Sequence, residues 1–107
     1  KSLNLNNFRF NRSKKSRINK VAVCGGSGSD LLDNALMSGA DALVTADIKY
    51  HTFQDAGNRI LLIDAGHYET EIHSLNEIKN RIEKSIIDRT KVYKYKGSTN
   101  PIVFYNN

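Results

Sequence analysis

The sequence has a single cysteine and no long hydrophobic run, which argues against a disulfide-stabilised protein and against a membrane-spanning protein. A single cysteine, Cys24, among 107 residues excludes an internal disulfide framework and suits a reducing compartment. The cytoplasm is therefore the expected location. No apolar run approaches the roughly 20 residues of a membrane-spanning helix, and the first residues lack the apolar centre of a signal peptide. We therefore expect no membrane partner.

Acidic residues are missing from the first 20 positions, which hold seven Lys or Arg. The rest of the chain holds nine basic and eleven acidic residues and is close to neutral. A basic lead-in over residues 1–17 can follow phosphates, but Phe8 and Phe10 are its only aromatic side chains, which is too few for a ladder on which bases stack. We expect a solvated connector with a short edge strand within residues 3–12, and nucleic-acid binding is the weaker interpretation.

Three short apolar runs predict the strands of a sheet. They span residues 21–24, 42–45 and 60–63, and their continuous apolar character is typical of buried strands. Helical segments lie between them and end near Gly39 and Gly57, as helices commonly do at glycine. Strands that alternate with helices predict βαβ crossovers and a largely parallel sheet. The expected fold class is α/β, with residues 1–107 forming one domain.

Downstream of the third strand, the apolar spacing changes to that of a helix. Between residues 72 and 86, isoleucine and leucine recur three or four positions apart, which predicts an amphipathic helix. Residues 74–77 have the form of a capping box, so the helix is expected to restart at Ser74. Residues 91–96 alternate around Val92, Tyr93 and Tyr95, which predicts a half-exposed strand.

The most polar segments of the chain follow the three predicted strands. They are residues 25–29, 47–51 and 64–71. In a parallel sheet the carboxyl ends of the strands share one edge, and ligands bind there. We therefore expect these three segments to converge on one site.

The first segment is a glycine-rich turn between a strand and a helix. Its backbone N–H groups could hold an anion, and the residues concerned are Gly25, Gly26, Ser27 and Gly28. It is not a P-loop, since no Gly-Lys-Ser/Thr follows, and it lacks the third glycine of the dinucleotide fingerprint. The alternative is a tight turn that lets helix and strand pack closely, and the sequence does not decide between the two.

The second segment carries three side chains that could line a pocket. Asp47 could bind a metal or orient a ligand, Lys49 could neutralise a phosphate, and His51 could move a proton. The alternative is an aspartate at a helix N-cap followed by exposed helical residues. Asp64, after the third strand, also has two possible roles: it could cap a helix, or it could hydrogen-bond a metal ligand without binding the metal itself.

His67 and Glu71 are the sharpest metal-ligand candidates. They are four residues apart, so on a helix their side chains share one face. Imidazole and carboxylate together suit a divalent ion of the Zn, Mn or Fe type. The alternative is an exposed pair with no ligand, which also occurs on surface helices. Two ligands do not complete a site, since a catalytic zinc needs at least three from the protein.

Taken together, these segments resemble a known family. Residues 21–29, 45–51 and 64–71, in this order and spacing, and the closing residues 98–102 look like the C-terminal segment of the Nif-three-like family of dinuclear-metal proteins. That family comprises the homologues of type 2 GTP cyclohydrolase I. The resemblance covers about residues 3–104, nearly the whole chain.

The resemblance implies a Nif-three-like α/β fold and a site for two divalent metal ions. His67 and Glu71 would be ligands, and Asp47, Lys49 and His51 would line the pocket. The family's other ligands, a histidine pair and an aspartate, come from an N-terminal half that this chain lacks, so its own site would be incomplete. The family assembles as a ring-shaped hexamer, which implies self-association.

The implied function has two alternatives. One is metal-assisted hydrolysis of a small molecule or nucleotide, as in the opening of the GTP ring. The other is a non-enzymatic metal- or nucleotide-binding module with a regulatory or scaffolding role. The sequence does not decide between them, because kinship and fold do not determine the substrate.

Overall fold

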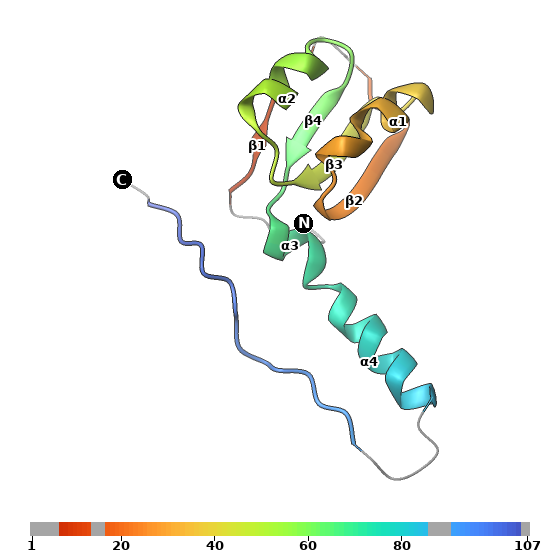
Figure 1. Cartoon of the computed structure of the whole chain (residues 1–107), viewed down its shortest axis with the longest axis vertical. Helices are drawn as coiled ribbons and strands as arrows, with labels where there is room; N and C mark the ends of the chain where they lie inside the picture. The colour runs from red at the N-terminus through yellow and green to blue at the C-terminus, as the bar shows by residue number, and fades with distance from the viewer. Residues whose placement is uncertain (1–6, 14–16, 86–90, 106–107) are drawn as a thin grey trace.

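A four-stranded sheet forms the centre of the part of the chain that the structure describes (Figure 1). The structure is a computed structural model, and it describes residues 7–13, 17–85 and 91–105. The strands are β1 (Arg9–Phe10), β2 (Val21–Ser27), β3 (Ala42–Ala46) and β4 (Leu61–Asp64), in the spatial order β1-β4-β3-β2. β2, β3 and β4 are parallel, and β1 adds to the outer edge of β4 in the antiparallel sense. The predicted α/β class with a largely parallel sheet is confirmed, and the predicted edge strand is β1; residues 1–6 lie outside the described part.

Two helices connect the parallel strands. A 3₁₀ turn (Ser29–Leu31) leads into α1 (Leu32–Met37) between β2 and β3, and α2 (Tyr50–Ala56) connects β3 to β4. Both helices end close to the predicted glycines, Gly39 at φ 80° and Gly57 at φ 52°, which adopt a backbone conformation that other residues rarely adopt. The N-cap of α2 is Lys49, so Asp47 is not the helix cap that the sequence allowed.

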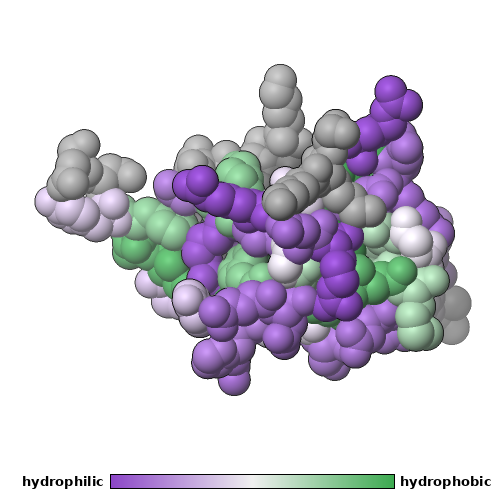
Figure 2. All heavy atoms as spheres, turned by 90° about the horizontal axis from the view of Figure 1, so that it is seen from above, coloured by the Kyte–Doolittle hydropathy of each residue, from purple (hydrophilic) through white to green (hydrophobic). Residues whose placement is uncertain are grey.

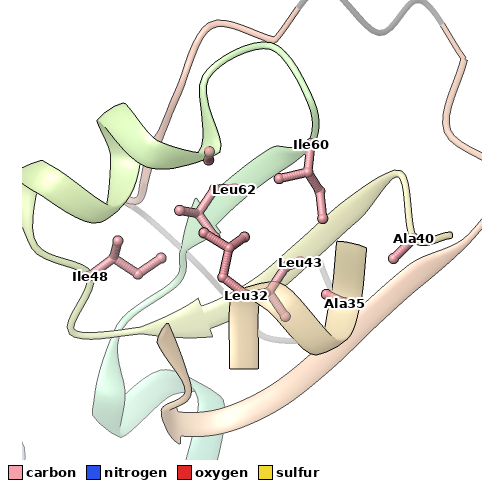
Figure 3. Close-up of a cluster of buried hydrophobic side chains, with 8 residues drawn as sticks. Leu32, Ala35, Ala40, Leu43, Ile48, Ile60 and Leu62 are labelled. Carbon is pink, nitrogen blue, oxygen red and sulfur yellow. The ribbon is translucent and has the colours of Figure 1, made fainter. Parts of the chain in front are cut away.

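The hydrophobic core lies between the sheet and these two helices. Leu43 from β3 and Leu62 from β4 are buried under Leu32 of α1 and Ile48 of the segment before α2 (Figure 3). Ile60 is also fully buried, and Ala56 closes the cluster from α2. Both helices therefore pack on the same face of the sheet.

The opposite face of the sheet is partly open. Val23, Val44 and Ile63 are neighbours in the strand register, so they share this face. Val23 is 70% exposed and Val21 is 50% exposed, whereas parallel strands are normally covered on both sides. The prediction of a buried strand at residues 21–24 is therefore wrong: β2 is an edge strand on which Val21 and Val23 stay exposed, although α3 contacts its glycine-rich end.

The segment after β4 contains two helices, α3 (His67–Glu71) and α4 (Ser74–Ser85). The predicted restart at Ser74 is confirmed, although residue 86 lies outside the described part. The apolar stripe of α4 is not buried, because Leu75, Ile78 and Ile82 remain between 36% and 49% exposed. Seen from above, hydrophobic surface interrupts the hydrophilic exterior of the molecule (Figure 2).

Residues 91–105 run past α4 without forming a strand (Figure 1). The prediction of a strand at residues 91–96 is wrong. An alternating pattern does not by itself form a strand, because the strand backbone needs hydrogen bonds to a neighbouring strand. The edges of the sheet are β1 and β2, and residues 91–96 pair with neither of them. Tyr93 and Tyr95 are accordingly exposed. Within the described ranges, no helix has both the length and the apolar character that crossing a membrane requires.

Candidate metal site

The segments that follow the three parallel strands meet at one edge of the sheet. Ser27, at the end of β2, donates a hydrogen bond from Oγ to Asp47 Oδ2 at 2.5 Å. His67, at the start of α3, has its Nδ1 atom 2.5 Å from the same carboxylate oxygen. Asp47 follows β3 and His67 follows β4, so all three strand ends contribute. The predicted convergence is confirmed.

His67 and Glu71 occupy successive turns of α3, as their spacing predicts. The His67 Nε2 atom lies 2.9 Å from Glu71 Oε1, and both side chains are about half exposed, at 48% and 52%. The imidazole therefore stands between two carboxylates, with Asp47 on its Nδ1 side and Glu71 on its Nε2 side. An ion on the Nε2 side would meet one nitrogen and up to two oxygens.

Electrostatics in this cluster favour a positive charge on the imidazole. The hydrogen bond from Ser27 lowers the pKa of Asp47, and the hydrogen bond with His67 lowers it further. The hydrogen bond to Asp47 raises the pKa of His67 above its ordinary value of 6.5, and the negative charge of Glu71 adds to the rise. The same charge distribution favours a divalent cation in place of the proton on Nε2.

Asp64 ties together the two turns that carry Asp47 and His67. Its carboxylate is buried and accepts hydrogen bonds from the backbone N–H of Ile48 at 3.1 Å and of Gly66 at 3.1 Å. Asp64 is thus neither a helix cap nor a ligand in this arrangement. Through these hydrogen bonds it holds the backbone next to Asp47 and next to His67, and the sequence did not decide between this supporting role and a helix cap.

Arg9 connects the basic lead-in to the same edge. Its guanidinium pairs with Asp64, donates to the Ile48 carbonyl at 2.8 Å and lies 5.3 Å from the centre of the Phe53 ring. The expectation that this region is only a solvated connector is therefore wrong at Arg9. The reason is the antiparallel pairing of β1, which places Arg9 opposite Asp64. Nothing in the composition of the lead-in indicated this partner.

The glycine-rich turn brings β2 close to α3. The Gly26 N–H donates to Thr70 Oγ1 at 2.8 Å, so it is already engaged. A Cβ at Gly26 would collide with the Glu71 carboxylate, and a Cβ at Gly28 would lie 2.5 Å from Thr45 Oγ1. Close packing therefore explains these glycines. Two carboxylates beside the turn also make it a poor place for an anion, so the geometry favours the packing role that the sequence weighed equally.

Of the three pocket candidates, Asp47 is the one that contacts the His67–Glu71 pair in the described part of the chain. His51 Nδ1 lies 3.1 Å from Gln54 Oε1 on its own helix. Among the described residues, no hydrogen bond or ion pair joins Lys49 or His51 to His67 or Glu71. Their predicted pocket role stays a prediction.

The donor set fits part of a metal site. Within the described ranges, no three histidine, cysteine or acidic side chains come together as a group that could hold an ion. Asp47 fails as a third ligand because the imidazole separates it from Glu71. One nitrogen and one carboxylate on the open side leave coordination positions for ligands from elsewhere.

A cavity of about 740 Å³ opens beside this pair. His67 and Glu71 lie in its wall together with Asp47, Tyr68 and Phe104. Cavities of roughly 300–1,000 Å³ are typical of small-molecule sites. The pair is therefore accessible to a ligand larger than a metal ion.

Comparison with known families supplies the identity. The family model for Duf34/NIF3 (NGG1p interacting factor 3) matches residues 1–101. The chain belongs to the Duf34/NIF3 family. The resemblance to Nif-three-like proteins is thus confirmed over nearly the whole sequence.

Curated relatives in this family are considerably longer than the chain. A protein of Halalkalibacterium halodurans named GTP cyclohydrolase 1 type 2 homolog is 35% identical over 96 residues, which are 86% of this chain and 26% of that protein. One of the same name from Lactococcus lactis is 35% identical over 98 residues, 91% of this chain and 37% of the relative. The chain thus spans 26% and 37% of the length of these two relatives.

Solved structures agree. A Bacillus cereus protein related to NIF3 superposes with a TM-score of 0.80 and 25% identity, covering 97% of this chain and 30% of that one. A Staphylococcus aureus protein gives a TM-score of 0.77 and 31% identity, covering 96% and 34%. The NIF3-like fold of this chain is therefore one part of a larger architecture in those proteins.

Proposed function

We propose that this chain is the C-terminal part of a metal-dependent, hydrolase-like protein, a homologue of type 2 GTP cyclohydrolase I with a dinuclear divalent-metal site. The observation that carries the proposal is the His67 Nε2–Glu71 Oε1 pair, 2.9 Å apart and open to a cavity at the carboxyl edge of a parallel sheet. The names of the curated relatives support the assignment.

In this proposal His67 would hold a metal ion through Nε2, and Glu71 would supply its carboxylate oxygens as further ligands. Bound divalent ions would supply an activated water and would stabilise negative charge that develops on the substrate. The chain's own residues hold the ions and shape the cavity in which a small molecule or nucleotide binds. Asp64 keeps the supporting turns in place.

The remaining ligands come from an upstream half, in keeping with the length of the relatives. Two open apolar surfaces support a partner for this chain. One is the outer face of β2 and the other is the stripe on α4, where Val23 and Ile78 are 70% and 49% exposed. Large exposed apolar areas commonly mark protein–protein contacts. Upstream sequence and further copies in a family-type hexamer are the proposed partners.

The alternative function is a non-enzymatic metal- or nucleotide-binding protein with a regulatory or scaffolding role. The family description, an interacting factor, favours this candidate. It needs the same metal ligands and the same cavity, and it differs only in the absence of turnover.

Turnover of GTP by a full-length protein separates the two functions. With added Mn²⁺ or Zn²⁺, the hydrolase function predicts ring-opened product that increases with time and enzyme concentration and disappears on chelation. His67→Ala should abolish it, while His73→Ala, on the neighbouring loop, is the matched control. Metal binding together with GTP that remains unchanged over many hours would contradict the hydrolase function and favour the scaffold.

The pKa of His67 provides a second test of the cluster. In residues 1–107, NMR titration from about pH 5 to about pH 9 is expected to give His67 a pKa above 6.5. Asp47→Ala should lower it more than Glu71→Gln, because the Asp47 hydrogen bond is the largest cause of the rise. Since a proton on Nε2 competes with a metal ion, metal binding weakens as the pH falls through this pKa. A His67 pKa that neither substitution changes would contradict the described cluster.

A further inference from the structure

Asp47 has an unusual backbone conformation in addition to its place in the cavity wall. Asp47 adopts φ 56°, the left-handed region, and in the described ranges no other residue except glycine has a positive φ. Such a backbone costs free energy and persists where the surroundings require it, often at functional sites. The Ile48 N–H, held by Asp64, fixes the peptide that follows. The strained turn is thus built into the sheet edge.

The turn directs the Asp47 carboxylate at one specific atom. Oδ2 lies 2.5 Å from His67 Nδ1 and 2.5 Å from Ser27 Oγ, so two donors meet on one oxygen. Glu71 lies on the opposite nitrogen of the ring. The two carboxylates therefore contact different nitrogens of the ring, Asp47 on Nδ1 and Glu71 on Nε2, although both line the same cavity.

We propose that Asp47 is the positioning residue of the metal ligand His67: it holds the proton on Nδ1 and thereby leaves Nε2 free for the ion, with Ser27 orienting Asp47 in turn. This inference rests on the proposed metal site and deepens it. An imidazole that binds a metal through one nitrogen commonly donates from the other to a carboxylate, which selects the tautomer and the ring orientation. The chain Ser27–Asp47–His67 has that form.

The alternative, that Asp47 is itself a ligand, does not fit the positions of these side chains. A carboxylate on the Nδ1 side cannot share an ion bound to Nε2 of the same ring. A purely structural role for Asp47 is the other alternative, and it predicts no effect on the imidazole tautomer.

The test joins NMR to metal affinity. The first measurement uses metal-free residues 1–107 at a pH where His67 is neutral, and the ¹⁵N chemical shifts of the ring should show the proton on Nδ1. In Asp47→Ala the proton should be predominantly on Nε2, because Glu71 is then the remaining carboxylate acceptor. In a full-length protein, Asp47→Ala should weaken Zn²⁺ binding by about 10- to 100-fold, and Ser27→Ala by less. Asp55→Ala, an exposed acid on α2, is the charge-matched control and should leave both measurements unchanged.

The outcomes are distinguishable. An unchanged tautomer in Asp47→Ala, or unchanged zinc affinity while His67→Ala loses zinc, would overturn the positioning role and leave the metal site standing. Zinc affinity that survives His67→Ala would instead remove the proposed metal site. A melting temperature of Asp47→Ala close to wild type would exclude general unfolding as the cause; if it is much lower, Asp47→Asn, of nearly the same shape, replaces it in both measurements.

Discussion

Leu62→Ala is expected to destabilise residues 1–107 by about 2–5 kcal/mol, the usual cost of truncating a fully buried leucine. Leu62 has no exposed surface and lies under both helices that cover the sheet. The truncation would leave a void between β4 and these helices, since the rigid sheet restricts how far the surroundings can close it. Urea unfolding followed by circular dichroism gives the free energy of unfolding for both proteins.

The matched control is Val23→Ala on the same sheet. Val23 is an aliphatic strand residue that is 70% exposed, so its truncation should change the free energy of unfolding by less than about 1 kcal/mol. Equal losses for the two variants would contradict the described one-sided core. In a full-length protein the Val23 effect should grow, because the proposed upstream half would cover this face.

His67→Ala is expected to remove most bound metal from a full-length protein. In the proposed site His67 is the nitrogen ligand from this chain, so the expected loss of zinc affinity exceeds the roughly 10- to 100-fold of a residue that only supports a ligand. Metal analysis after gel filtration measures the ions that remain per chain. His73→Ala should retain them, since His73 lies outside the cluster. Full retention of metal by His67→Ala would exclude His67 from the site.

Much of the fold could be predicted because the pattern is local. Short apolar runs followed by polar turns and helical spacing predicted β3, β4 and the helices between them, and the sheet is parallel as expected. The convergence of Asp47 with His67 also followed, because parallel strands place their carboxyl ends at one edge. The spacing of His67 and Glu71 was sufficient to place both side chains together.

Features that depend on distant neighbours could not be predicted. Val23 reads as a core residue, but its exposure depends on what covers the sheet edge. Tyr93 and Tyr95 alternate like strand residues, but in the described part of the chain no strand pairs with their segment. Asp64 accepts hydrogen bonds from the backbone N–H groups of Ile48 and Gly66, and it pairs with Arg9, which is 55 residues away in the sequence. No spacing rule relates such positions.

The left-handed backbone at Asp47 is a further feature without a sequence signal. Aspartate tolerates this conformation better than most residues, but a strand end followed by Asp-Ile is also compatible with a helix cap, which the sequence analysis allowed. The conformation of Asp47 depends on two hydrogen bonds: Asp64 accepts from the Ile48 N–H and holds the turn, and Ser27 donates to the Asp47 carboxylate. Only the assembled sheet edge brings these groups together.

The most direct test of the account is the metal stoichiometry of residues 1–107 beside that of a full-length protein. The central claim is that this chain supplies His67 and Glu71 to a site completed elsewhere. Calorimetric titration with Zn²⁺ should show two ions bound per full-length chain, and weak or incomplete binding by residues 1–107, because one imidazole and one carboxylate leave coordination open. Tight, stoichiometric binding of two ions by residues 1–107 alone would contradict the account.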